Sequence, residues 1–593
     1  MPSLPRIDGE VLPLILSWPV LACIILLSLF TVYMTFVPHL PTDGGFTLDH
    51  WRAIGSPYVL TKVLPNTAIV GVLSVTVALA FGCPLAWLLN RAVVPFRRTL
   101  ITLMAVSVVV PGFVKAMGWI MLVDQRVGIL NKALAAPFGL QTLPIGINNV
   151  YGVAWIMGLL LTPTMFFLLS GPMQALDPSL EEAASVVGAG RWQAMLRVSL
   201  PLLWPGILGG SLYLFMTALS IFEVPALIGG MGGQVPVLAT ELFFQIHPPS
   251  PTSVEIDYGV AGVFGALIAA PSLIGLYFYR RVLVRARQYE VVTGRGYRPR
   301  PIELGKAKYL GLAFALFYLL LGVGLPMLVL VWASLLPNLE LPSAAALARI
   351  SFVNYSKFLP AMGGTVIIRN TLIVVLCTAA LVLLVSLMTS WIVVRSRRRL
   401  RLAMDGIVLI SHAIPGMAFA FGLFVIALLA AKWARWLPLT GTLGIIVFAH
   451  LLNRLPYATR ITNAALIQIH RDLDESARVC GASGPRTILR VVAPLIKPSL
   501  VFAGLWTALL SFSEVTMALF LTESRNKVLA VGVWSLWATG YLTIAAAAAV
   551  IIVGLVSVIV FVALAVTGSR LHEHSLVAPP SGSLGATSAE SGP

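Results

Sequence analysis

Charged residues are scarce in this chain of 593 residues: Asp, Glu, Lys and Arg make up 11%, whereas hydrophobic residues make up 58%. Soluble globular proteins are about 25% charged and about 45–50% apolar. The mean hydropathy of +0.92 points the same way. A chain of this length cannot cover a water-exposed surface with so few charges. The composition therefore excludes a soluble protein and predicts an integral membrane protein with many spans.

Signatures of disulfides, metal sites and enzyme active sites are also absent. No CxxC pair occurs among the four cysteines, Cys23, Cys83, Cys377 and Cys480, and the eight histidines form no cluster with metal-ligand spacing. HExxH and GxSxG motifs do not occur, and Gly305-Lys306-Ala307 is not a phosphate-binding loop. We therefore expect no catalytic residue, no metal site and no cofactor bound by this chain. If ATP drives the protein, a separate subunit must bind ATP and Mg²⁺.

Twelve stretches reach the roughly 20 apolar residues that a membrane span needs. Backbone polar groups in lipid must be satisfied internally, so we expect these stretches to be helices. In the first half they are 12–37, 67–89, 99–123, 150–174, 206–228 and 259–279. In the second half they are 309–335, 371–394, 404–430, 441–466, 499–521 and 543–567.

Basic residues exceed acidic residues by 40 to 23, which gives a net charge of +17. In a soluble protein this excess would suggest nucleic-acid binding, but in a membrane protein basic residues collect in cytoplasmic loops. With the N-terminus inside, 26 of the basic residues fall in cytoplasmic segments and 12 outside. We therefore expect both termini in the cytoplasm and no nucleic-acid partner.

An internal repeat organises the chain. The segment EAASVVGAGRWQAMLRVSLP, from Glu182, aligns without a gap with ESARVCGASGPRTILRVVAP, from Glu475, at an offset of 293 residues. Two landmarks recur at an offset of 304 residues: Asn66-Thr67 with Asn370-Thr371, and Pro111-Gly112 with Pro415-Gly416. Six spans per copy return the chain to the same side, so the copies are parallel and related by a pseudo-two-fold axis along the membrane normal. We expect a first repeat at 1–295, a second at 296–574 and a disordered tail at 575–593.

Each aligned segment belongs to a loop, about 177–205 and about 470–498, that lies inside between the fourth and fifth spans. Each copy opens with a capping-box pattern, has a glycine where a left-handed turn would end a helix, and closes with a proline that would end a second short helix. These residues are Ser179 with Glu182, Gly188 and Pro201 in the first copy, and Asp472 with Glu475, Gly481 and Pro494 in the second. The pattern predicts a helix–turn–helix that projects into the cytoplasm from each half.

Both segments resemble the EAA loop of the permeases of ATP-binding-cassette importers. That pattern is Glu-Ala-Ala, three residues, Gly, nine residues, an apolar residue, any residue, then Leu-Pro. The first copy matches it at Glu182, Ala183, Ala184, Gly188, Leu200 and Pro201. The second keeps Glu475, Ala477, Gly481 and Pro494 but has Ser476 and Ala493 where the pattern has Ala and Leu. In that family the loop is a coupling helix that docks in a groove of the ATPase subunit.

The resemblance covers nearly the whole chain and implies its fold and partners. It implies an all-α integral membrane protein of the bacterial inner membrane, with about twelve transmembrane helices in two parallel six-helix repeats of the MetI-like type. Two copies of an ATPase subunit would hold ATP and Mg²⁺ and dock on the loops. A periplasmic or lipid-anchored solute-binding protein would deliver the cargo, and membrane lipid would surround the chain.

Two fused permease units with FTLDHW and SFVNYS ahead of the second and eighth spans resemble the ferric-iron importer permeases. Ferric iron is therefore the first expectation for the cargo. Thiamine permeases share the fused plan, and polyamine and 2-aminoethylphosphonate systems are relatives, so these three cargoes remain alternatives.

Pathway residues are expected where polar or helix-breaking residues occur inside spans. Glu223 and Glu514 lie in apolar surroundings near the outer ends of the fifth and eleventh spans, and they either line a pathway or hydrogen-bond at a helix seam. The prolines and glycines of Pro111-Gly112 and Pro415-Gly416 either interrupt their helices, as in broken transport helices, or are tolerated kinks. Arg454 and Arg460 in the tenth span either pair with acidic neighbours or extend toward the cytoplasm.

A secondary transporter is the alternative from another functional class. Twelve spans in two parallel halves of six also describe the major facilitator plan. That family carries a basic loop between its second and third spans, and the nearest motif here, from Asp124 to Gly128, is predicted to lie outside after the third span. We interpret that motif as a chance match.

Overall fold

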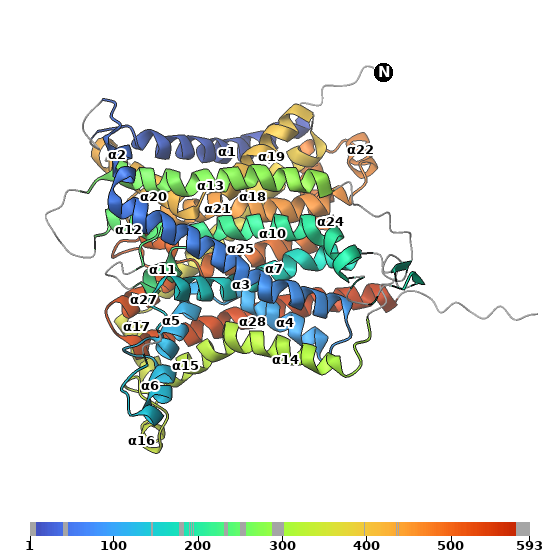
Figure 1. Ribbon diagram of the computed structural model, residues 1–593. Helices are drawn as coiled ribbons and strands as arrows, with labels where there is room; N and C mark the ends of the chain where they lie inside the picture. Colours follow the sequence, from blue (N-terminus) through green and yellow to red (C-terminus); the bar gives the residue numbers. More distant parts are fainter. Residues whose placement is uncertain are drawn as a thin grey trace, which may run out of the picture.

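The computed structural model describes residues 8–38, 45–143, 146–176, 183–229, 235–248, 256–286 and 302–576, apart from 185, 189, 191, 192, 194, 397, 435 and 437. Within these residues the chain is helical, and its β-type pairing is limited to an isolated bridge between Ala92 and Ile302. The long helices lie side by side in one bundle (Figure 1). The predicted all-α fold is confirmed.

All twelve expected spans are helical, some in two pieces. In the first half they are α1 (Asp8–Met34), α3 (Leu64–Arg91), α4 (Arg97–Val109) with α5 (Gly112–Val123), α7 (Val150–Ala175), α10 (Leu200–Ser220) with α11 (Glu223–Ile228), and α13 (Tyr258–Ala286). In the second half they are α14 (Ala307–Leu319) continuing through a π-helical turn into α15 (Leu325–Ser334), α18 (Val366–Arg395), α19 (Arg398–Ala413) with α20 (Gly416–Trp433), α21 (Leu443–Ile467), α25 (Lys497–Phe512) with α26 (Thr516–Leu521), and α28 (Leu542–Leu576).

By length and composition, nine helices in the described part of the chain can cross a membrane, or up to 11 if two bent pairs each count as one span. Helix α21 is not among them, although it is 25 residues long. Its apolar sequence is interrupted by His450, Arg454 and Arg460. The expected number of about twelve is reached only if this polar helix also crosses the membrane.

Four of the expected spans are broken rather than continuous. Pro111 and Pro415 each stand at the N-cap of the next helix, with φ −57° and ψ 140° at Pro111 and φ −56° and ψ 138° at Pro415. Helices α4 and α5 meet at 96° across the first of these breaks. The cause is that proline lacks an N–H and disfavours a helical residue before it. Of the two alternatives left open for the Pro-Gly pairs, interruption of the helix applies at both.

The other two breaks contain no proline. Helix α10 ends at Ser220 and α11 begins at Glu223, while α25 ends at Phe512 and α26 begins at Thr516. The expected spans 206–228 and 499–521 are therefore each divided into two helices. Both carboxylates singled out in the sequence, Glu223 and Glu514, lie at these breaks, where the chain leaves the helical path.

The first helix of each half packs against the other half. Helix α1 contacts α18 and α20, and α15 contacts α5. The second contact is close because Gly118 of α5 lies where a β-carbon would come within 2.6 Å of the Pro326 backbone. Within each half, α3 packs along α7 and α18 along α21. This exchange of first helices joins the two halves into one body with a continuous buried core.

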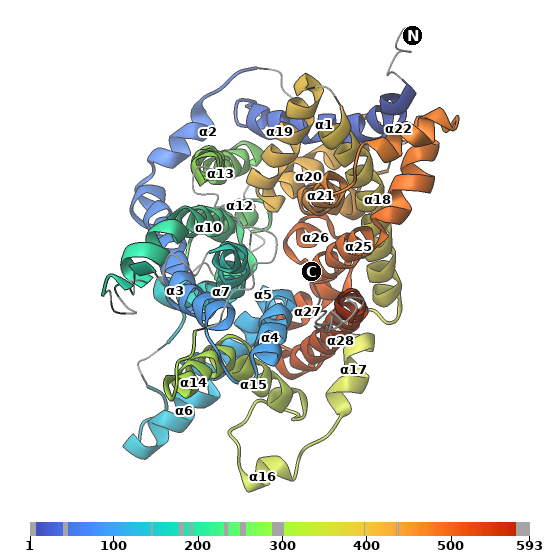
Figure 2. The ribbon, with the colours of Figure 1, turned by 90° about the vertical axis from the view of Figure 1, so that its right-hand side faces the viewer.

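Short helices mark the two ends of the bundle (Figures 1 and 2). One end, which we call the α22 face, carries α22 (Asp472–Val479) together with the beginning of α1 and the end of α28. The opposite end, the α16 face, carries α2 (Asp49–Arg52), α6 (Ile129–Ala135), α12 (Leu238–Ile246), α16 (Ala344–Leu347), α17 (Val353–Ala361) and α27 (Leu529–Ala538).

Candidate functional site

The glycines of the two repeated loops have the same backbone conformation. The φ angle is +88° at Gly188 and +81° at Gly481, and at both positions a β-carbon would meet nothing within 4 Å. The predicted left-handed turn is therefore confirmed in each half. Because the surroundings are open, glycine is required here by its backbone conformation and not by packing.

The second loop shows how this glycine ends a helix. The Gly481 N–H donates to the Arg478 carbonyl at 2.9 Å, and the Ala482 N–H donates to the Ala477 carbonyl at 3.0 Å. These are the two hydrogen bonds of a Schellman motif. Glu475, Ser476 and Ala477 lie in α22, just before this motif. In the first loop Ala183, Ala184 and Gly188 are described, while Glu182 and Ser179 lie outside the described residues.

The structure differs from the prediction at the beginning of the second loop and at the end of both loops. Asp472 is the first residue of α22, the N-cap is Arg471, and no side chain caps the helix, so the capping box predicted for the second loop is wrong. Leu200 and Pro201 do not end a short helix, because they form the first turn of α10, where proline's missing N–H has no effect. Pro494 lies within the one-turn helix α24 (Ala493–Leu495), ahead of an 84° bend into α25.

Each loop is tied to the bundle by an arginine at the end of a long helix. Nη1 of Arg91 donates to the Leu176 carbonyl at 3.0 Å, and Nη2 of Arg395 donates to the Ile469 carbonyl at 2.9 Å. Arg91 and Arg395 are 304 residues apart, and their acceptors are 293 residues apart. The arginines repeat at one offset and the carbonyls at the other. The contact between Arg91 and Leu176 in the first half is therefore equivalent to the contact between Arg395 and Ile469 in the second half.

In the second half this arginine also holds α22 itself. Nε of Arg395 lies 2.8 Å from a carboxylate oxygen of Asp474, and the two side chains are 10% and 8% exposed. Burial raises the pKa of Asp474 above its usual range, and the charge of Arg395 opposes that rise. A buried carboxylate with a counter-ion fixes the orientation of α22 on α18.

The far side of the loops exposes apolar side chains. Val186, Val187 and Val479 are 87%, 88% and 88% exposed, next to Gly188 and Gly481. Val186 and Val479 are 293 residues apart and thus occupy equivalent positions. Valines this exposed on both loops mark a surface that fits a protein partner. We call these three residues the valine tips.

A cavity of about 570 Å³ lies between the two halves. Its lining includes all six residues that the sequence singled out as pathway candidates: Pro111, Gly112, Glu223, Pro415, Gly416 and Glu514. At Gly112 a β-carbon would lie 2.9 Å from Leu160 and 3.1 Å from Oε1 of Glu223. At Gly416 it would lie 2.9 Å from Nδ2 of Asn453. Because these two positions carry no β-carbon, the neighbouring side chains can pack directly against the backbone of the two breaks.

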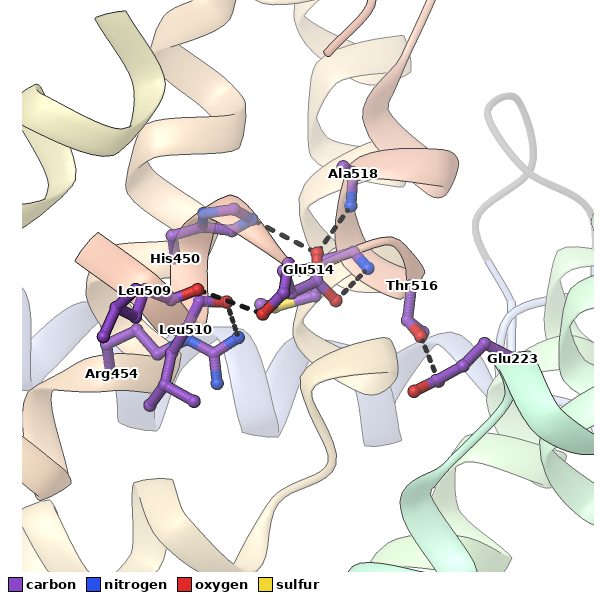
Figure 3. Close-up of polar contacts among 10 residues, drawn as sticks. Glu223, His450, Arg454, Leu509, Leu510, Glu514, Thr516 and Ala518 are labelled. Carbon is purple, nitrogen blue, oxygen red and sulfur yellow. Dashed lines mark hydrogen bonds and ion pairs between the residues drawn. The ribbon is translucent and has the colours of Figure 1, made fainter. Parts of the chain in front are cut away.

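The two carboxylates in this cavity have different environments (Figure 3). Glu223 accepts a hydrogen bond of 3.0 Å from the hydroxyl of Thr516, in the other half. Glu514 accepts the backbone N–H groups of Met517 and Ala518 at 2.8 and 3.1 Å and lies 3.2 Å from Nε2 of His450. Glu514 is thus fully engaged by the protein, whereas Glu223 keeps acceptor capacity toward the cavity.

Glu223 and Glu514 are not equivalent positions of the repeat. They are 291 residues apart, whereas Glu223 and Thr516 are separated by the 293 residues of the loop repeat. By this offset Thr516, and not Glu514, is the counterpart of Glu223. The structure still brings both carboxylates to one cavity, as the search for pathway residues expected.

The two arginines of α21 have different fates. Arg454 lines the cavity, and its Nη2 donates to the Leu510 carbonyl at 3.2 Å (Figure 3). Arg460 lies 3.4 Å from Asp405, and its side chain is 50% exposed. Of the two alternatives predicted for these arginines, pairing with an acidic neighbour applies to Arg460.

Among the described residues, no group of three or more His, Cys, Asp or Glu side chains could hold a metal ion.

Comparison with known families identifies this arrangement. The family model described as the binding-protein-dependent transport system inner membrane component matches residues 78–289 and, a second time, residues 383–573. The chain belongs to this family. Each matched stretch contains one of the repeated loops and one of the two carboxylates of the cavity.

Known proteins similar to this permease include iron and polyamine systems. It is 25% identical to the ferric transport system permease protein FbpB of Actinobacillus pleuropneumoniae over 522 residues, 86% of this chain and 72% of that protein. It is 24% identical to the Fe(3+)-transport system permease protein FbpB 2 of Haemophilus influenzae over 486 residues, 80% of this chain and 84% of that protein. The spermidine/putrescine transport system permease protein PotB of Haemophilus influenzae is 28% identical over 225 residues, 37% of this chain and 76% of that protein.

The family match decides between the functional classes considered for the sequence. The chain is the membrane-spanning permease subunit of an ABC importer in the inner membrane, and it is not a secondary transporter. The two matches agree with two fused permease units.

Sequence reasoning missed several residues of the permease that the structure brings forward. Asp474 and Arg395 form the ion pair under α22, and His450 orients Glu514. The sequence shows the valines of the valine tips close to the repeated glycines, but it does not show that they are exposed. A stronger signal was the repeat itself, because Arg91 and Arg395 recur at the offset of the Pro-Gly pairs.

Proposed function

We propose that this permease moves ferric iron from a solute-binding protein into the cytoplasm, and that two copies of a separate ATPase subunit drive it. Ferric iron is favoured by the FbpB relatives, whose similarity extends over most of the chain. A polyamine is the second candidate, supported by the shorter match to PotB. Thiamine and 2-aminoethylphosphonate have no such support among these relatives.

The observation that carries the proposal is the pair of equivalent loops. Each has a glycine in the left-handed conformation, an arginine tie to the bundle and an exposed valine tip, and the two are set 293 residues apart. Two equivalent docking points suit two identical partner subunits. ATP binding would close the two ATPase copies, and each docked loop would carry its half of the permease with it.

This proposal assigns the sides of the membrane. The α22 face would be cytoplasmic, with both termini there, and the α16 face would meet the binding protein. The excess of basic residues in the segments assigned to the α22 face supports this orientation. The cavity between the halves would be the substrate's route, and rocking of the halves would open it to alternate sides.

The stoichiometry of the complex tests the proposal. The permease is co-expressed with its ATPase subunit, purified in lipid nanodiscs and weighed by native mass spectrometry. We expect two ATPase subunits per chain, and no ATP hydrolysis by the chain alone. A complex with no ATPase subunit, or hydrolysis by the isolated chain, would contradict it.

A further inference from the structure

The two walls of the central cavity differ in chemistry although they are related by the repeat. Helices α7 and α21 begin 293 residues apart, at Val150 and Leu443. The side chains His450, Asn453, Arg454 and Tyr457 follow the i, i+3, i+4, i+7 spacing of one helix face. Their counterparts in α7 are Met157, Leu160, Leu161 and Thr164. One wall is therefore polar and the other almost entirely apolar.

Arg454 is the charged centre of the polar wall. Its Nη2 donates to the Leu510 carbonyl, while its buried Nε has no hydrogen-bond partner among the described residues. The ion pairs within the described residues do not include Arg454, although its charge acts on the nearby Glu514. The oxygens of Glu514 accept the N–H groups of Met517 and Ala518 and lie close to Nε2 of His450. The guanidinium of Arg454, which lines the cavity, is thus only partly occupied by protein acceptors.

Keeping a guanidinium in the middle of a transmembrane bundle is unfavourable unless it binds something. Intramembrane charges are rare, and they usually face a cavity and serve a transport pathway. The planar guanidinium matches the oxygens of a phosphate, phosphonate or carboxylate group, to which it can donate two parallel hydrogen bonds. Asn453 lines the cavity beside Arg454 and adds a further hydrogen-bonding group, and Tyr457, which is hydrogen-bonded to Tyr213, lines it next to them.

The first half contributes a carboxyl group. Glu223 lines the same cavity, accepts a hydrogen bond from Thr516 and takes part in no ion pair within the described residues. We propose that the face of α21 centred on Arg454 is a subsite for an oxyanion group of the transported solute, and that Glu223 faces the cationic centre of that solute. This proposal rests on the proposed import function. For ferric iron it means that the ion crosses together with an oxyanion ligand, because the guanidinium repels a bare trivalent cation.

Binding of small anions to the purified permease tests the subsite without any transport. The chain is placed in nanodiscs, and its thermal midpoint is followed while inorganic phosphate or 2-aminoethylphosphonate is added at constant ionic strength. A ligand that binds the folded state raises the midpoint in a saturable way. We expect saturable stabilisation of the wild type by both probes and its loss in Arg454→Gln. Arg454→Lys keeps the charge without the planar fork, and we expect at least fivefold weaker apparent affinity.

The same helix supplies a matched control. Arg460→Gln removes an equal charge from α21, but that side chain is half exposed and paired with Asp405, so its binding curve should equal that of the wild type. Glu223→Gln should weaken 2-aminoethylphosphonate, which carries an ammonium group, and leave phosphate binding unchanged. If Arg454→Gln does not fold, Arg454→Lys against Arg460→Gln decides the result.

Two outcomes overturn the subsite: no saturable stabilisation of the wild type, or equal stabilisation of the wild type and the Arg454 variants. A failure of ferric-iron uptake in liposomes would sink the proposed cargo and leave this binding result intact. The two proposals therefore fail separately.

Discussion

Glu223 and Thr516 meet across the centre of the permease, through a hydrogen bond of 3.0 Å from the threonine hydroxyl to the glutamate (Figure 3). The two residues are 293 residues apart, which is also the distance in sequence between the two repeated loops. Positions related by the repeat thus touch each other, as residues on either side of a pseudo-two-fold axis do. The first half has a glutamate at this position and the second half has a threonine, so the two sides of the cavity differ in chemistry at its centre.

The unequal environments of Glu223 and Glu514 predict unequal variants. Glu223→Gln should lower ATP-dependent uptake at least tenfold with normal expression and ATPase binding, because its carboxylate faces the cavity. Glu514→Gln should instead reduce thermal stability, since it replaces an acceptor of two N–H groups with one that is half donor, at a cost of about 1–3 kcal/mol. Uptake and thermal midpoints are measured side by side. Normal uptake in Glu223→Gln would rule out its pathway role.

Valine at the left-handed glycines should uncouple the loops without unfolding the bundle. A side chain with a β-carbon at φ near +80° costs roughly 1–2 kcal/mol, enough to displace the turn beside the valine tips. We expect Gly188→Val and Gly481→Val each to lower uptake and ATPase pull-down about tenfold. The Gly188 variant should be at least as damaging, because the second loop departs from the family pattern at Ser476 and Ala493.

Gly190→Val is the control for these loop variants. This glycine lies two residues after Gly188, and a β-carbon there would meet nothing within 4 Å. Its uptake should match that of the wild type. Equal losses in Gly188→Val and Gly190→Val would assign the effect to added bulk in the loop instead of backbone conformation.

Removal of Arg395 should make the docking of α22 sensitive to pH. In Arg395→Met the buried Asp474 loses its counter-ion, so its pKa rises further in the docked state. A carboxylate whose pKa is higher when docked favours docking while protonated and opposes it once ionised. The protection of the α22 amides, measured against their intrinsic exchange rates, should therefore fall between pH 5 and pH 8 in the variant.

The second variant in this series is Arg395→Met with Asp474→Asn, where a neutral side chain needs no counter-ion. Protection of α22 should return at pH 8. Arg486→Met, which changes an exposed arginine of the loop that is not among the charges acting on Asp474, should behave as the wild type throughout. Identical exchange in Arg395→Met and Arg486→Met would show that the ion pair does not hold α22.

Alanine at the glycines of the two breaks should narrow the cavity. At Gly112 the added carbon would lie 2.9 Å from Leu160, and at Gly416 it would lie 2.9 Å from Asn453. Such overpacking typically costs about 1–3 kcal/mol and shifts the wall. We expect uptake to fall severalfold in each variant. Gly406→Ala, in α19 with open space around it, should retain full uptake and gain slightly in stability.

The parts of the fold that could be predicted from sequence are those with a local or repeated signal. Apolar length located the twelve helical segments, and the gap-free repeat located both loops and the left-handed glycines. The Pro-Gly pairs located two of the four broken helices, because proline forces the break by its own covalent structure.

The remaining features depend on tertiary contacts that no single segment encodes. The breaks ahead of α11 and α26 contain no proline, and there the chain turns so that Glu514 can accept N–H groups of Met517 and Ala518. The hydrogen bond between Glu223 and Thr516 joins residues 293 positions apart, which is the offset of the repeated loops. Predicting it would have meant extending that offset beyond the loops to the residues of the cavity. The packing of α1 on α18 joins segments more than three hundred residues apart, and no periodicity reports such a contact.

The most direct test of the account is iron uptake into liposomes that contain the permease, the ATPase subunit and internal ATP, with the iron-loaded binding protein added outside. The account predicts uptake of ⁵⁵Fe that requires all three proteins, stops with vanadate and is insensitive to collapse of the proton gradient. Uptake that proceeds without the ATPase subunit, or that follows the proton gradient and ignores vanadate, would contradict it.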